Sequence, residues 1–212
     1  MRKIFGGSSA TEGRGAGGPR VSRHSSGWTQ LRADLRDRES LRVLDIGPTS
    51  STNINLLTGL GHSLYMANLV EEAARPEWKL NPTDEHPASF EIEKFLAANL
   101  DFAGRTFNVV TFWDSADYLP ADVVAPIIER LHSVMEPGGK LLAFFHSKAV
   151  GPDTAFHRYH LTDSDNVELQ GGGSHVIQQV YNNREIENLF KAFSSYRFFL
   201  AKDNLREVLV TR

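Results

Sequence analysis

Short apolar segments alternate along the chain with segments whose apolar residues recur at helical spacing. Leu41–Ile46 and Phe107–Trp113 are typical of buried strands, and the second is continuous enough to be covered on both faces of a parallel sheet. Residues 121–135 have the helical period, and Glu136-Pro137-Gly138-Gly139 forms a turn before another apolar run, Lys140–Phe145. This alternation of strand and helix predicts an α/β fold.

Further segments complete the predicted sheet. The pattern indicates strands at His62–Asn68 and Ser89–Phe95, and a polar turn separates two more, Tyr196–Ala201 and Glu207–Thr211. The last two strands follow each other directly and are expected to pair as an antiparallel hairpin. We predict a Rossmann-like, doubly wound sheet of seven strands, mostly parallel, with this C-terminal hairpin at one edge.

The chain of 212 residues has room for one sizeable core. Residues 6–27 are rich in Gly, Ser and Arg and carry few apolar side chains, so residues 1–27 are expected to form a flexible N-terminal arm. From residue 28, apolar residues at helical spacing predict an amphipathic helix that leads into the first strand. We therefore expect one domain over residues 28–212.

Composition excludes several classes of protein. The chain has no cysteine, which excludes disulfides, thiol nucleophiles and thiolate zinc sites. A net charge of -3 argues against general nucleic-acid binding, which needs a basic surface. No apolar run approaches the length of a membrane span, and the N-terminus lacks the pattern of a secretory signal. We expect a soluble, cytoplasmic protein, and a homo-oligomer is compatible with these features.

The most informative segment is the sharp turn after the first strand. Val43-Leu44-Asp45-Ile46-Gly47 ends a strand on a glycine, and a helix is expected to begin a few residues later. A glycine turn lets the backbone approach a ligand closely, and the start of a helix presents free N–H groups. The segment therefore indicates a crevice for a nucleotide cofactor. Thr49 and Ser51 follow the turn, and their hydroxyls either contact a ligand or cap the helix.

Four segments together resemble the class I S-adenosylmethionine-dependent methyltransferases, over about residues 41–212. The segment that ends at Gly47 is similar to the family's first motif, and Leu64–Asn68 is similar to its second strand. Phe107–Asp114 resembles its fourth strand, and Met135–Leu142 resembles the turn before its fifth. The resemblance implies S-adenosylmethionine as the cofactor and a last strand that runs antiparallel to the others.

The resemblance also implies which residues contact the cofactor. Asn68 stands where the family carries a ribose-binding carboxylate, and Asn99 is the polar residue near the end of the expected third strand, where the family often holds the adenine amino group. Pro48, Thr49 and Ser51 occupy the glycine turn itself. The cofactor-binding residues implied in this way are Asp45, Gly47, Pro48, Thr49, Ser51, Asn68, Leu69, Asn99, Leu100 and Trp113.

Methyl transfer needs mainly proximity and alignment, with a base only for hydroxyl or protonated amine acceptors. The carboxyl ends of the fourth and fifth strands are expected to bring Trp113, Asp114, Tyr118 and His146 to the rim of the crevice. We expect Asp114, Tyr118 and His146 to be catalytic. Asp114 orients an amine or the methionine ammonium, or caps the next helix, and Tyr118 lines the pocket or packs in the core. His146 is the candidate base, or it only makes a structural hydrogen bond.

Residues 150–180 suggest an inserted hairpin, and this region tends to cover the substrate in the family. His157 and His160 lie on one of its predicted strands, where side chains three residues apart face opposite sides, so we expect no metal site.

These features predict a methyltransferase that uses S-adenosylmethionine and acts on a small molecule. An alternative is a protein of the same fold that has lost catalysis and acts as a binding or scaffolding module, which Asn68 and the missing second and third glycines of the turn favour. A nicotinamide-dependent oxidoreductase would share the first strand and turn, but the chain has no Tyr-x-x-x-Lys pair.

Overall fold

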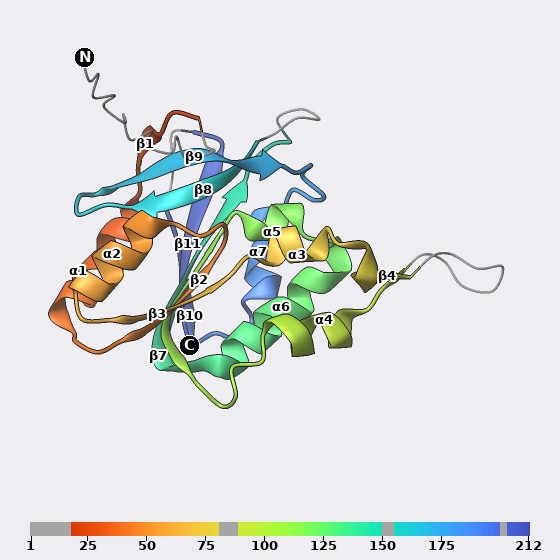
Figure 1. The fold of residues 1–212 in the computed structure, drawn as a ribbon, viewed down its shortest axis with the longest axis horizontal. Coiled ribbons are helices and arrows are strands. Elements are labelled where there is room, and N and C mark those ends of the chain that lie inside the picture. Colours follow the sequence, from red (N-terminus) through yellow and green to blue (C-terminus); the bar gives the residue numbers. More distant parts are fainter. Residues whose placement is uncertain (1–17, 81–88, 150–154, 200–202) are drawn as a thin grey trace, which may run out of the picture.

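The computed structural model describes residues 18–80, 89–149, 155–199 and 203–212, which build a central sheet between two layers of helices (Figure 1). The strands lie in the order β10 (Ser195–Phe199), β11 (Leu205–Thr211), β7 (Met135–His146), β6 (Phe107–Trp113), β2 (Arg42–Ile46) and β3 (Ser63–Ala67). The four strands from β7 to β3 are parallel, β11 runs antiparallel to β7, and β10 runs antiparallel to β11 in the terminal hairpin. This arrangement confirms the predicted fold class.

The sheet has six strands in the described part of the chain, one fewer than the seven predicted. The strand expected at Ser89–Phe95 is replaced by helix α4 (Ile92–Asn99). Only Ser89–Phe90 is extended, as strand β5, and it pairs with β4 (Lys79–Leu80) in a separate small sheet. The helix forms because Ile92, Phe95 and Leu96 share one helical face, which packs into the core.

Two helices cover one face of the sheet and the others cover the opposite face (Figure 1). The first face carries α1 (Ser26–Asp37) and α2 (Ser51–Gly59), which pack on strand residues such as Val43 and Leu142. The second face is covered by α3 (Leu69–Ala73), α4, α5 (Ser115–Tyr118), α6 (Ala121–Val134) and α7 (Asn183–Leu189), and a short 3-10 helix, Pro76–Trp78, precedes β4. Both layers exclude water from the central strands, as the continuous apolar run at Phe107–Trp113 predicts.

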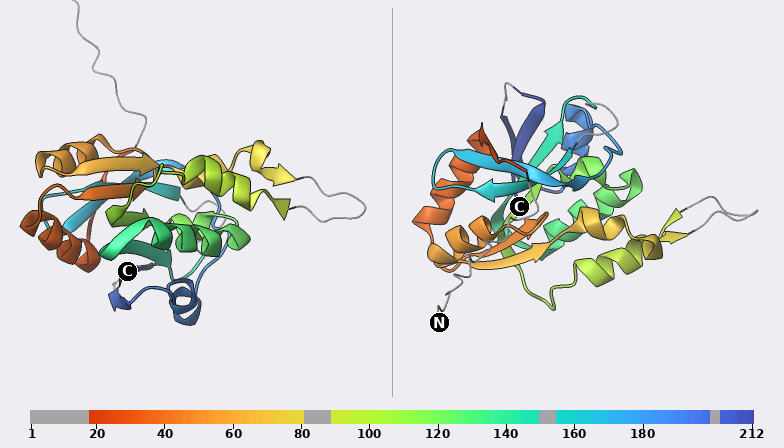
Figure 2. Two further views of the ribbon diagram at one scale, coloured as in Figure 1. Left: turned by 90° about the horizontal axis from the view of Figure 1, so that it is seen from below. Right: turned by 45° about the horizontal axis from the view of Figure 1, so that its top comes forward.

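A second sheet of three strands lies across the carboxyl end of the central strands (Figures 1 and 2). Strand β8 (Ala155–Leu161) pairs with β9 (Asn166–Ser174), and β9 pairs with β1 (Val21–His24). The hairpin β8–β9 is the insertion predicted within residues 150–180. Its apolar residues Tyr159, Leu161 and Val167 point into the core shared with α1 and α2, so the hairpin is fixed to the domain by buried contacts.

The prediction of a flexible arm over residues 1–27 is wrong for residues 21–27, which belong to β1 and the start of α1. The buried Arg23 guanidinium pairs with Glu207 and Asp203, and the Glu207 carboxylate also accepts hydrogen bonds from Ser25 and from the Gly27 amide. Gly27 leaves no room for a side chain, since a Cβ atom would lie 2.5 Å from Leu142. Residues 1–17 of the expected arm lie outside the described residues.

None of the helices formed by the described residues is long and apolar enough to cross a membrane.

Candidate active site

Asp45 lies near the end of β2, and its carboxylate accepts three hydrogen bonds from other side chains of the chain. Its Oδ1 accepts hydrogen bonds from the Thr111 hydroxyl (2.6 Å) and the Trp113 indole Nε1 (2.7 Å), and its Oδ2 accepts one from Asn53 Nδ2 (2.8 Å). Burial raises the pKa of Asp45, and these hydrogen bonds oppose the rise by stabilising the charged form. Asp45 therefore fixes the neighbouring strands and the start of α2 around the turn.

The indole of Trp113 covers the glycine turn. A Cβ atom at Gly47 would lie 3.2 Å from Trp113 Cδ1, so the ring occupies the space that a side chain would fill. The ring also stacks on Tyr159, with centroids 4.7 Å apart and planes 3° from parallel. Trp113 is 2% exposed and has φ of 47°, a left-handed conformation that is uncommon for a bulky residue. The contacts with Asp45, Gly47 and Tyr159 thus hold a strained residue over the predicted cofactor turn.

The hairpin β8–β9 covers the start of α2. Ser50, which is the helix N-cap, accepts a hydrogen bond from the Asn53 amide and contacts His160 Nδ1 at 2.8 Å. Asn53 accepts a hydrogen bond from the Leu161 amide (2.7 Å) and donates one to the Tyr159 carbonyl (3.1 Å). Ser50 is therefore the helix cap that sequence reasoning missed, while Ser51 is exposed and Pro48 is buried beside the covered turn.

The residues predicted on the adenosine side lie in two different places. Asn68 is the N-cap of α3, with Oδ1 accepting from the Glu71 amide at 3.5 Å, and Leu69 is buried behind it. Asn99 and Leu100 were expected at the end of a strand, but they end helix α4. Asn99 donates its side-chain hydrogen bond to the Phe95 carbonyl of its own helix. Their expected place at the carboxyl end of a third strand is therefore wrong.

The three predicted catalytic residues come together beyond β6 and β7. His146, the last residue of β7, donates through its backbone amide (2.7 Å) and contacts through Nδ1 (2.8 Å) the same oxygen, Oδ2 of Asp117 in α5. The Tyr118 ring lies edge-on to the His146 imidazole, with centroids 5.9 Å apart. Asp114 precedes α5 and interacts electrostatically with His146. Asp117 was not predicted, although it lies one helical turn after Asp114.

The carboxyl groups of this cluster are strongly desolvated. Asp114 is fully buried, and neither of its oxygen atoms makes a hydrogen bond of regular geometry with the described residues, although the Tyr159 hydroxyl lies close enough to act on it. Burial raises the pKa of Asp114 to about 7, against the opposing effects of His146 and the nearby Tyr159 hydroxyl. Burial also raises the pKa of Asp117, while its contacts with His146 lower it. Asp114 does not cap α5 through its side chain, so one of its two predicted roles is excluded.

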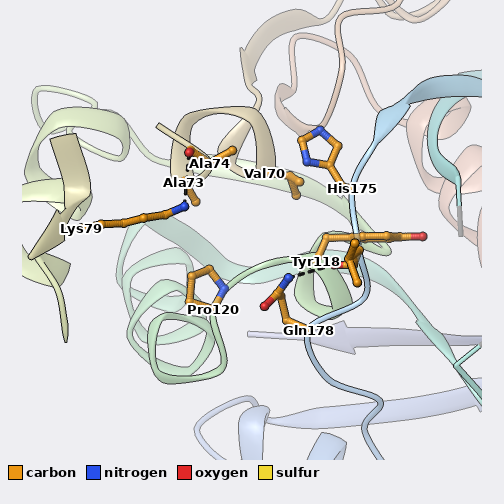
Figure 3. Close-up of a pocket in the computed structure, with 9 residues that line it drawn as sticks. Val70, Ala73, Ala74, Lys79, Tyr118, Pro120, His175 and Gln178 are labelled. Atoms are coloured by element: carbon orange, nitrogen blue, oxygen red, sulfur yellow. Dashed lines mark hydrogen bonds between the residues drawn. The ribbon is translucent and has the colours of Figure 1, made fainter. Parts of the chain in front are cut away.

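A hollow of about 190 Å³ lies next to this cluster (Figure 3). Val70 and Ala73 of α3 form one wall, and His175 and Gln178, which follow β9, form another. Tyr118 lines the hollow and also contacts His146, so its ring separates the hollow from the Asp117–His146 pair. Its hydroxyl makes a long hydrogen bond of 3.5 Å to the Ala155 carbonyl.

Comparison with known proteins identifies the class. A family model described as a methyltransferase domain matches residues 22–193, and the chain therefore belongs to this family. No curated protein matches the chain.

Solved structures share the fold at low identity. A protein from Pyrococcus horikoshii is 14% identical, with a TM-score of 0.50 over 87% of this chain and 88% of its own. The magnesium protoporphyrin IX methyltransferase from Synechocystis, solved with S-adenosylmethionine, is 14% identical, with a TM-score of 0.48 over 88% and 76%. A methyltransferase from Mesorhizobium loti that depends on S-adenosylmethionine is 13% identical, with a TM-score of 0.46 over 89% and 98%.

Proposed function

We propose that this chain transfers a methyl group from S-adenosylmethionine to a small-molecule acceptor. The observation that carries the proposal is the Asp117–His146 pair, which stands with Asp114 and Tyr118 where β6 and β7 end. In open α/β sheets, ligands bind at the carboxyl ends of the strands. Membership of the methyltransferase-domain family supports the reaction class.

His146 is the proposed general base. The Asp117 carboxylate accepts from Nδ1, which assigns the proton to Nδ1 and leaves Nε2 with a free lone pair. An imidazole held in this tautomer can take a proton from an acceptor near neutral pH. Asp117 acts as a positioning residue, because it holds both the backbone and the ring of His146. The site therefore suits an acceptor that must lose a proton, such as a hydroxyl or a protonated amine.

In the arrangement described, the Trp113 indole lies over the glycine turn, where a cofactor would approach the backbone. The Trp113 ring fills the space at Gly47, and β8 covers the start of α2. S-adenosylmethionine at this turn requires the indole to leave Gly47, and we propose that the hairpin β8–β9 then serves as the substrate cover. Thr49 and Ser51, which are exposed, and the half-buried Asn68 are the polar residues of the predicted set near this turn that remain accessible to it.

A second candidate function is a binding module without catalysis. The covered turn favours it, because the hydrogen bonds of Asp45 and Asn53 are all made within the chain. Under this alternative, the stacked Trp113 and Tyr159 are permanent core residues rather than a movable cover.

Calorimetric titration with S-adenosylhomocysteine separates the two candidates. Under the proposal, wild type binds the ligand and Gly47→Ala binds it more weakly, because the added methyl group occupies the turn. Gly59→Ala is the matched control, since a Cβ there meets nothing within 4 Å. Absence of binding by wild type and by Trp113→Ala, with both proteins folded, would refute the methyltransferase proposal and leave the binding module.

A test of the base uses transfer activity once an acceptor is known. Asp117→Asn is expected to lower the transfer rate and to change its pH profile while S-adenosylhomocysteine binding stays unchanged, because the amide no longer fixes the charge and tautomer of His146. An unchanged pH profile would contradict the role of the pair.

A further inference from the structure

We propose that the methyl acceptor is an organic amine, which binds as an ammonium ion between Asp114 and Asp117. This inference rests on the proposed function and adds the substrate class to it. The inference is drawn from three carboxylate oxygens, which are both oxygens of Asp114 and Oδ1 of Asp117. Each is buried and makes no hydrogen bond of regular geometry with the described residues. Both side chains are fully buried.

Burying a carboxylate oxygen without a hydrogen-bond donor lowers the stability of the folded state, because the oxygen loses its hydration and no protein donor replaces the water. The neighbouring protein groups offset only part of this cost. His146 and the Tyr159 hydroxyl act on Asp114, and His146 and Arg206 act on Asp117, yet burial still raises the pKa of both carboxyls. His146 uses Nδ1 on the other oxygen of Asp117, and the Arg206 guanidinium donates to Asn183 and to the carbonyls of Tyr181 and His146. The cluster therefore lacks a cation at Asp114, and a ligand ammonium supplies both the charge and up to three N–H donors.

Aromatic groups around the carboxylates fit the same ligand. The buried Tyr159 hydroxyl lies beside Asp114 and interacts with its carboxyl group, although the two do not meet the geometry of a regular hydrogen bond. Tyr118 packs edge-on against Phe156 and His146. Rings attract cations through their negative faces, whereas two carboxylates repel an anionic acceptor such as a carboxylate or phosphate. The electrostatics of the cluster therefore select an amine over an acid.

The hollow beside Tyr118 provides the route to this site. Figure 3 shows the Tyr118 ring at the wall of the hollow, below His175 of the segment that follows β9. The hydroxyl is held only by the long contact with the Ala155 carbonyl, while the ring packs on Phe156 and His146. The proposal therefore requires the Tyr118 ring to turn within these contacts, which would join the hollow to the cluster. An ammonium bound there can pass one N–H proton to Nε2 of His146, which leaves a neutral amine with a free lone pair.

The inference is tested with four probes on the full chain. Methylammonium, benzylammonium, benzyl alcohol and benzoate are each titrated while thermal stability and ligand NMR signals are followed. Methylammonium is included because it is the smallest of the four probes and tests the charge without an aromatic group. We expect both amines to bind and raise the melting temperature, and the alcohol and the acid to have no such effect.

Variants locate the amine. Asp114→Asn keeps the shape of the side chain but removes its charge, and is expected to weaken amine binding by about tenfold to a hundredfold. Asp122→Asn, an exposed acid at the start of α6, is the matched control and should bind like wild type. The melting temperature of each variant without ligand reports that it is folded.

Each remaining outcome is decisive. If neither amine binds, or if benzoate binds equally well, the amine assignment is wrong. S-adenosylhomocysteine binding in the same protein would still support the methyltransferase proposal. If benzylammonium competes with S-adenosylhomocysteine but not with 5′-methylthioadenosine, which lacks the amino-acid part, then Asp114 holds the donor's own ammonium group, and the acceptor assignment is overturned.

Discussion

Replacing Trp113 by alanine should open the glycine turn and tighten S-adenosylhomocysteine binding. In wild type, a ligand at Gly47 must first displace the indole from Asp45 and Tyr159. The hydrogen bond to a buried carboxylate contributes about 1.5–3 kcal/mol and the aromatic stack about 0.5–1.5 kcal/mol. A displaced indole regains part of this through new contacts, so the net cost of opening is about 2 kcal/mol. The variant avoids this cost and should bind roughly 30-fold more tightly.

The same substitution should lower the free energy of unfolding. Removing a buried tryptophan leaves a cavity and costs about 3–5 kcal/mol. Trp113→Gly should be more stable than Trp113→Ala by about 0.5–1 kcal/mol, the reverse of the usual order, because glycine adopts the φ of 47° without strain. Urea denaturation followed by circular dichroism measures both differences.

A matched control separates the opening of the turn from a general loss of stability. Phe145→Ala creates a large cavity on the opposite face of the sheet and leaves the indole over Gly47. It should lose similar stability without a gain in affinity. Calorimetry that finds Trp113→Ala binding no more tightly than wild type would refute the argument that the indole is the barrier.

Three further predictions concern the buried Asp114, the predicted ribose contact of Asn68 and the anchoring of strand β1 by Arg23. The free energy of unfolding should fall as pH rises from about 4 to about 7, because the raised pKa of Asp114 makes the folded state hold a proton that the unfolded chain releases; a denaturation series should show a weaker dependence in Asp114→Asn. Asn68→Asp should tighten S-adenosylhomocysteine binding by roughly 1 kcal/mol by turning a neutral ribose contact into a charge-assisted one, and an equal calorimetric affinity would count against that contact. Arg23→Ala should cost about 3 kcal/mol of stability, since it strands the buried Glu207 carboxylate, and amide exchange should quicken in β1 and β9 but not in β6; unchanged exchange there would contradict the anchoring role.

The sequence by itself determined the parallel core and the terminal hairpin. Apolar runs such as Phe107–Trp113 are long enough to identify strands without tertiary information, because burial on both faces leaves no polar alternation. The positions of Tyr118 and His146 also followed from sequence, since each lies just beyond a predicted strand or turn. The seven-residue segment Ser89–Phe95 was misassigned because the alternation of Phe90 and Ile92 fits a strand, whereas Ile92 and Phe95 also fit the helical spacing.

Only the tertiary structure decided how the side chains meet at the site. The indole of Trp113 and the carboxylate of Asp45 are 68 positions apart, and Asp117 and His146 are 29 apart, so no local pattern indicates either contact. Whether the glycine turn is open depends on the rotamer of Trp113 and on the docking of β8, which long-range packing fixes. The sequence thus located the glycine turn where a crevice is predicted, and the packing of distant segments determined that the Trp113 indole covers it.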